Sequence, residues 1–202
     1  MAHEFAILQA ARLKGRLSPA LAADSCGIDA DTALSEFDTL RDAGYVKGEP
    51  SVRLTPEGRE RLAALVAAER TGVDQAELAA LYEEFDHHNT DLKQVINAWQ
   101  LKAGAPNDHS DSAYDRSVIE RLVSLHAGFA PLVSRIAAVA PRLAAYSRRF
   151  EHAVEQIETG DISFIARPIA DSYHTVWFEF HEELIGLLGL TRAEEAAAGR
   201  AV

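Results

Sequence analysis

The chain has 202 residues, of which 48% are hydrophobic and 25% are charged, and its formal net charge is −11. This composition is ordinary for a globular protein and excludes a disordered or fibrous chain. The length allows one large domain or two small ones. The chain shows no apolar run approaching the roughly 18 residues that cross a bilayer, no signal-peptide pattern and a single cysteine. We therefore expect a cytoplasmic protein without membrane contact.

The charge is unevenly distributed along the chain. Residues 1–70 hold nine Lys/Arg and eleven Asp/Glu, giving −2, whereas residues 71–202 hold eleven and twenty, giving −9. The second part therefore repels polyanions, and any contact with nucleic acid must come from the first part.

The first seventy residues predict helices separated by clear stop signals. Ser18 and Thr55 are N-caps, each followed by a proline at the first helical position, where its missing N–H costs nothing. A third helix is capped by Asp29 or Asp31 and runs to about residue 43. The other predicted elements are helices over 4–14, 19–25 and 56–70, and a small hairpin of strands over 45–47 and 52–54.

The stretch "LRDAGYVKG", followed by "SVRLTPEGRERL", resembles the end of the recognition helix, the wing and the next helix of bacterial MarR-like winged helix-turn-helix regulators. The resemblance covers residues 5–70. It implies an N-terminal winged helix of three helices plus a short β-hairpin wing, with the third helix in the major groove of DNA. It further implies a transcriptional regulator that forms a homodimer through helices flanking the wing domain.

The charge of the third helix weakens the case for DNA binding. One side holds Ala33, Phe37 and Leu40, and the opposite arc holds four acids and no base. Most affinity for duplex DNA comes from neutralising phosphates, which this arc opposes. The candidate DNA contacts are the hydroxyl residues of that arc and nearby bases, namely Thr32, Ser35, Thr39, Arg16, Lys47 and Arg53. The alternative is a winged-helix interaction module that has lost DNA binding and contacts a protein through the acidic third helix.

Residues 71–192 predict an all-helical antiparallel bundle that serves dimerisation or ligand sensing, followed by a frayed tail over 193–202. Asn89 or Thr90 is expected to restart a helix, and Ser112 with Asp115 to cap another. The intervening loop, 104–112, contains oxygen and imidazole ligands, but it lacks the spacing of a calcium loop, so we interpret it as an exposed linker. The last main helix is predicted over 168–189.

On a helical wheel, the helix over 168–189 separates into an apolar and an acidic arc. His174 and His181 fall in the apolar arc with Trp177, whereas Glu179 and Glu183 fall in the other arc. We therefore expect the acids to form the solvated face and the two imidazoles to point inward.

Two further histidines, His88 and His126, also fall on apolar arcs of their helices. Three interpretations remain open for the four residues: separate core histidines, a pocket for an acidic small-molecule effector, or a metal site. The candidate pocket residues are His88, His126, His174, Trp177 and His181. No cofactor is assigned.

Catalytic motifs are absent from the sequence: there is no Gly-rich phosphate loop, no nucleophile elbow and no H-E-x-x-H, so we expect no enzymatic activity. The segment "RPIADSYHTVWFEFHEELIGLLG" resembles segments of actinobacterial proteins that pair winged-helix modules with phosphoenolpyruvate-utilising dikinases. That resemblance implies such an enzyme as a possible protein partner.

Overall fold

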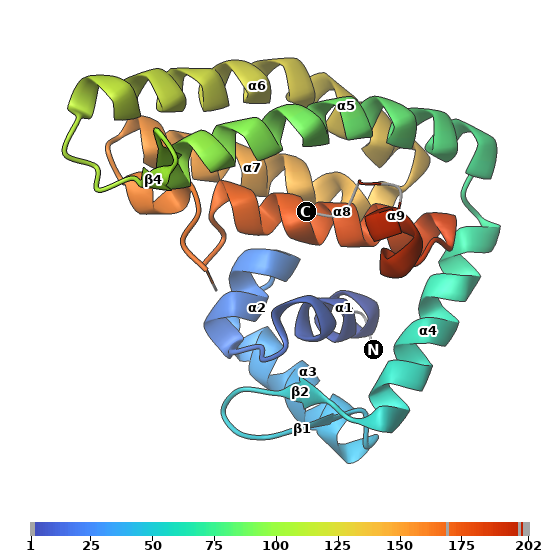
Figure 1. The fold of residues 1–202 in the computed structure, drawn as a ribbon. Coiled ribbons are helices and arrows are strands. Elements are labelled where there is room, and N and C mark those ends of the chain that lie inside the picture. Colours follow the sequence, from blue (N-terminus) through green and yellow to red (C-terminus); the bar gives the residue numbers. More distant parts are fainter. Residues whose placement is uncertain (1–2, 169, 198, 200–202) are drawn as a thin grey trace. The chain divides into compact units, whose positions relative to one another are not determined.

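The computed structural model describes residues 3–168, 170–197 and 199. The chain divides into two compact units, Met1–Gly72 and Val73–Val202. Figure 1 shows that both are built mainly from helices, with two small strand pairs. The prediction of a mostly helical fold is therefore confirmed.

The first unit contains the predicted elements in the predicted order. Its helices begin and end within about two residues of the predicted bounds, because the caps and glycines that mark their ends act locally. The elements are α1 (Glu4–Lys14), α2 (Pro19–Cys26), α3 (Ala30–Asp42), β1 (Val46–Lys47), β2 (Arg53–Leu54) and α4 (Pro56–Thr71).

The start of α4 depends on a close contact with the residue before β1. The hydroxyl of Thr55 accepts a hydrogen bond from the Gly58 amide at 3.0 Å and donates one to the Gly44 carbonyl at 2.7 Å. A Cβ at position 58 would lie only 1.9 Å from the Tyr45 carbonyl oxygen. The Thr-Pro-Glu-Gly sequence thus fixes α4 against the strand, and glycine is required there for steric reasons.

The core of the first unit lies between its helices and the hairpin. Val46 pairs with Leu54, and Leu17 forms an isolated antiparallel bridge with Val52, so a third short segment joins the hairpin. The largest fully buried side chains are Phe37, Ile7, Leu8, Leu17 and Leu40.

The second unit is a bundle of four main helices. α5 (Gln75–Gln100) and α7 (Ala145–Glu158) each pack against α6 (Ser112–Val139) and α8 (Tyr173–Leu188). The shorter elements are β3 (Leu101–Lys102), β4 (Ala105–Pro106), the 3-10 turns Pro141–Ala144 and Ile162–Phe164, and α9 (Arg192–Ala197). The β3–β4 hairpin joins α5 to α6 and is an exception to the predicted all-helical second half (Figure 1).

Aromatic rings from all four main helices meet in the centre of this bundle. Trp177 of α8 lies 4.2 Å from Phe129 of α6 and 5.1 Å from Phe85 of α5, between ring centroids. Phe150 of α7 lies 5.9 Å from Trp177. Trp177, placed inward by the sequence pattern, is fully buried.

The predicted interruption of α5 near Asn89 is wrong. Asn89 is fully buried inside one continuous helix, and its side-chain oxygen accepts a hydrogen bond from the Trp177 indole N–H at 3.0 Å. Asparagine is a common helix cap, but here it is the buried hydrogen-bond partner of an indole. The local sequence does not distinguish these two roles.

Two bounds near the C-terminus also differ from the prediction. α8 begins at Tyr173, with Ser172 as its N-cap, rather than near residue 168. The tail expected to fray from residue 193 instead contains most of α9, in which Glu195 is buried. Residues 198 and 200–202 of that tail lie outside the described residues.

Among the described residues, α6 is long and apolar enough to cross a membrane by length and composition alone, which is weak evidence for a membrane span. This helix meets the test although it contains no uninterrupted apolar run of about 18 residues. The reason is that no Asp, Glu, Lys or Arg occurs from Leu122 to Ser134.

Candidate functional site

The exposed face of α3 is acidic, as its sequence predicts. Asp31, Asp38 and Asp42 are exposed, and so is Leu34, whose relative exposure of 44% is high for a large apolar side chain. Leu34 lies at the edge of the arc that holds these acids, so the acidic face borders an exposed apolar side chain.

Arg41, the single base of α3, is occupied by neighbouring groups. Its guanidinium contacts Asp38 at 2.6 Å and Glu49 at 3.7 Å, and donates to the Gly48 carbonyl at 3.4 Å. The positive charge of Arg41 is thus paired with acids of its own unit. A phosphate contact from Arg41 would have to compete with these acids.

Two of the three candidate hydroxyls on α3 make bonds within the helix. Thr32 donates its amide and hydroxyl hydrogens to Asp29 at 2.8 and 2.7 Å, and Thr39 donates to the Ser35 carbonyl at 3.0 Å. The side-chain hydrogen bond from Thr32, with its backbone bond, lowers the pKa of Asp29. Thr32 is therefore part of the helix cap, and Ser35 is exposed.

The candidate bases outside α3 come together on the hairpin. Lys47 pairs with Arg53 across the two strands, and the Leu17–Val52 bridge places Arg16 beside Arg53. All three side chains are exposed, because they alternate with the buried Leu17, Val46, Val52 and Leu54. The first unit thus has an acidic helix and a separate basic hairpin.

The interpretation of the α8 acids as a solvated face is wrong. Glu179 and Glu183 have relative exposures of 2% and 3%, and they form ion pairs with Arg149 at 2.6 Å and Arg142 at 2.7 Å. Arg149 also binds Asp171 at 2.7 Å. The acids can be buried because Arg142 and Arg149 pair with them inside the bundle.

These buried charges are tied to one another. Burial opposes the charge of Arg149, but its hydrogen bonds with Asp171 and the charge of Glu179 outweigh this, so its pKa is well above the usual value. Burial, and then the charge of Glu183, raises the pKa of the nearby Tyr146 hydroxyl. The ion pair between Arg149 and Glu179 joins α7 to α8.

His181 is the most buried of the four candidate histidines. Its Nε2 lies 2.8 Å from the Tyr82 hydroxyl, which donates to Glu195 Oε2 at 2.5 Å. Since the hydroxyl hydrogen goes to Glu195, an Nε2–H donating to the tyrosine oxygen completes this chain of bonds. Burial lowers the pKa of His181 to about 4. This chain of bonds links α5, α8 and α9.

The other three candidate histidines lie in different surroundings. His88 lines a groove of about 410 Å³ between α5 and α6, and His126 lines one of about 300 Å³ between α6 and α7. His126 Nδ1 lies 3.4 Å from the Tyr173 hydroxyl, and His174 is half-buried. Burial lowers the pKa of both His126 and His174. Neither groove is lined by more than one of the candidate pocket residues.

No group of three or more His, Cys, Asp or Glu in the described part of the chain is placed to hold a metal ion. Three of the four imidazoles have separate roles: His181 makes a hydrogen bond in the core, and His88 and His126 line two different grooves.

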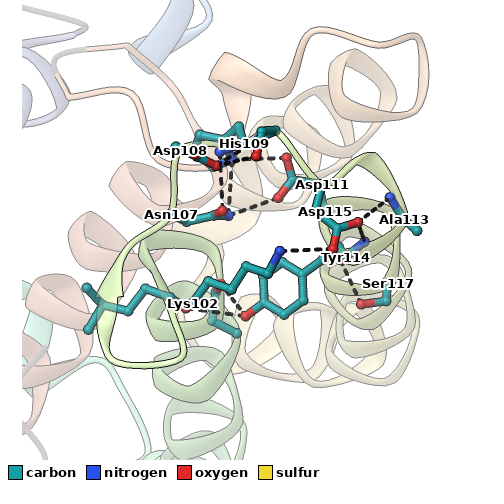
Figure 2. A network of polar contacts seen from close by, with 12 residues as sticks. Lys102, Asn107, Asp108, His109, Asp111, Ala113, Tyr114, Asp115 and Ser117 are labelled. Carbon is teal, nitrogen blue, oxygen red and sulfur yellow. Dashed lines mark hydrogen bonds and ion pairs between the residues drawn. The ribbon is translucent and has the colours of Figure 1, made fainter.

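The loop between α5 and α6 is an ordered polar network, shown in Figure 2. His109 Nδ1 lies 3.0 Å from Asp115 Oδ2, and Asn107 donates to the other oxygen of Asp115 at 2.9 Å. Asp111, not Ser112, is the N-cap of α6, and it also binds Lys102 at 2.9 Å. The loop is largely exposed, as expected, and its polar contacts also hold the β3–β4 hairpin to α6.

His109 has the chemical features of an oriented imidazole. Its ring lies 4.4 Å from the Trp99 ring, and its backbone has a φ of 58°, in the left-handed region. A carboxylate on Nδ1 fixes the tautomer of a neutral imidazole and turns Nε2 outward. No described cavity adjoins this group. The observed contacts support a structural role, which the sequence could have suggested through its run of turn-forming Asn, Asp and Ser residues.

Searches of protein-family models, of curated proteins and of solved structures found no match to this chain.

Proposed function

We propose that the first unit is a winged-helix interaction module whose third helix binds a basic protein surface. The observation that carries the proposal is the face of α3, where Asp31, Asp38 and Asp42 are exposed and Leu34 is exposed at their edge. An acidic face bordered by an apolar side chain suits a partner with a basic surface and an adjoining apolar socket. The same face would repel the phosphates of duplex DNA.

The state of Arg41 supports this choice over the recognition of duplex DNA. A DNA-reading helix needs a base that can reach a phosphate or a guanine edge. Arg41 is held by Asp38 and Glu49, and α3 contains no other Lys or Arg. The first partner to test is a phosphoenolpyruvate-utilising dikinase, because residues 167–189 resemble segments of proteins that pair winged-helix modules with such enzymes.

The proposal is tested with a photo-crosslinking amino acid at Leu34, applied in a lysate of the cells that contain the protein. A matched probe at Ala64, an exposed position of α4, serves as the control. We expect the Leu34 probe to capture one protein, with a yield that falls when Asp31, Asp38 and Asp42 are all changed to Asn. Crosslinks to nucleic acid, or equal yields at both positions, would contradict the proposal.

A second candidate function, contact with nucleic acid through the hairpin, is favoured by the clustering of Arg16, Lys47 and Arg53. Three exposed bases on one ladder can bind a phosphate backbone without a reading helix. This function predicts salt-dependent binding to duplex DNA that is lost when all three residues are changed to Glu.

A further inference from the structure

One exposed face of α6 carries no charge over almost four turns. Between Arg121 and Arg135 the helix has no charged residue, a length of about 20 Å at about 1.5 Å per residue. The exposed positions within it are small or weakly polar: Ser124, Ala127, Gly128, Pro131 and Ser134. A helix face that remains in water normally carries charged side chains. This α6 face therefore has the character of a surface that is covered.

Two residues of the α6 face are poor choices for an exposed helix interior. Glycine and proline are the least favourable helix formers, and Pro131 also removes the amide that would bond the Ala127 carbonyl. A Cβ at position 128 would meet only His88 Cε1, at an ordinary 3.9 Å, so packing within the described chain does not demand glycine. The close approach of another backbone would explain both residues.

The shape of the α6 face also suits a second helix. The two grooves described above lie on its two sides, one against α5 and lined by His88, the other against α7 and lined by His126. A low ridge of small side chains between two grooves is the geometry in which helices pack ridge into groove.

The charges at the two ends of the α6 face are complementary to each other. Glu120 is exposed at one end, and Arg135, whose side chain is 57% exposed, stands at the other. The two positions are equally far from the point between Ala127 and Gly128. In an antiparallel pair of α6 helices centred there, Glu120 of each copy faces Arg135 of the other. Arg135 also contacts Glu84 of α5, but a guanidinium has five N–H donors and can serve two carboxylates.

We propose that the α6 face is a homodimer interface in which two copies of the chain pack α6 against α6, antiparallel, about a two-fold axis between Ala127 and Gly128. A second copy is the occupant that fits, because one helix supplies both ends of the charge pair and the small ridge between them. The proposal is independent of the function proposed for α3, which lies in the other unit.

Sedimentation velocity on the full chain tests the interface. We expect the wild-type protein to be a dimer, and Ala127→Glu to raise its dissociation constant at least about a hundredfold, because two carboxylates would meet at the axis. The matched control is Ala79→Glu, at an exposed position of α5, which should leave the dimer unchanged.

A charge exchange separates a lost interface from a lost fold. Glu120→Arg should weaken the dimer, because it places two bases opposite each other, and adding Arg135→Glu should restore it. A wild-type protein that is monomeric at about 100 µM would overturn the proposal. A dimer that tolerates Ala127→Glu would also overturn it, and so would a monomer that binds vesicles of anionic phospholipid through this face.

Discussion

The acids of α3 and those of α8 are chemically alike but lie in opposite environments. Asp31, Asp38 and Asp42 are exposed on α3, whereas Glu179 and Glu183 are buried on α8 and paired with arginines. The difference arises outside the two helices. The segment 142–149 brings Arg142 and Arg149 to α8, whereas the base of α3 is one of its own residues. An exposed acid needs no ionic partner because water solvates its charge, whereas a buried acid needs one.

The largest effect is expected when the buried charge network is broken. Arg149→Ala should lower the free energy of unfolding of the second unit by about 3–5 kcal/mol, because it removes the guanidinium that pairs with the buried Glu179 carboxylate. Arg41→Ala, which breaks an exposed pair on α3, should cost at most about 1 kcal/mol in the first unit.

Denaturant unfolding measures this contrast. Both tryptophans, Trp99 and Trp177, lie in the second unit, so their fluorescence reports that unit, and hydrogen exchange reports the first. A loss under about 1 kcal/mol for Arg149→Ala would show that the buried network contributes no more than a surface pair.

A steric effect of intermediate size is expected at the start of α4. Gly58→Ala should destabilise the first unit by about 1–3 kcal/mol, because the new Cβ would overlap the Tyr45 carbonyl and force the backbone to move. Gly72→Ala is the matched control, since its Cβ would lie an ordinary 3.6 Å from the Glu69 carbonyl oxygen and its φ is −98°. Hydrogen exchange of the α4 amides checks the difference; equal protection in both variants would count against a steric role for Gly58.

Acidification should weaken the second unit through His181. Its pKa is about 4 in the folded chain, below the usual value near 6.5, so the unfolded chain binds the proton more readily between these pH values. The contribution of His181 to the free energy of unfolding is complete above about pH 6.5 and is lost as the pH falls toward 4. The loss at pH 5 is about 1–2 kcal/mol.

The measurement for His181 is tryptophan-detected unfolding at pH 7.5 and pH 5, for the wild-type protein and His181→Gln. The variant should lose less stability on acidification, while His126 and His174, unchanged in both proteins, cancel in the comparison. Identical losses would mean that His181 is readily protonated in the folded state.

The smallest effects are expected on the exposed acids of α3. Asp31 lies in the first turn of the helix and Asp42 is its last residue, so the helix dipole favours the first charge and opposes the second. Asp31→Asn should therefore destabilise the first unit, and Asp42→Asn stabilise it, each by about 0.3–1 kcal/mol. Thermal unfolding monitored by hydrogen exchange of the α3 amides shows whether each change raises or lowers the stability of the first unit. A large effect of either change would mean that the acid has an intramolecular partner.

Local signals explain why the elements of the first unit could be predicted from the sequence. Ser18, Asp29 and Thr55 cap their helices through hydrogen bonds to residues three positions later, so the information is contained within one turn. The exposed acids of α3 followed from its helical period in the same way.

Long-range partners explain what could not be predicted. Asn89 appeared to be a cap because its partner, Trp177, is 88 residues away, and Glu179 appeared solvated because Arg149 is 30 residues away. A wheel sorts side chains into two arcs, but it does not show what the neighbouring helix places against the polar one. The network around His109 was not specified for a related reason: turn residues indicate a loop, but they do not show that Asn107 and His109 bind Asp115 in the following helix.

The most direct test of the account is the binding of wild-type protein to a mixed-sequence duplex DNA library at about 50 mM salt, where counterion release favours association most. Fluorescence anisotropy of labelled duplexes provides the measurement, repeated with Arg16, Lys47 and Arg53 changed together to Glu. If α3 is a protein-binding face, the protein with the three changed bases shows no saturable binding even at this salt concentration. Tight binding by that variant, weakening steeply as salt is added, would contradict the account and assign α3 to DNA, whereas binding seen only in the wild-type protein would assign the contact to the hairpin.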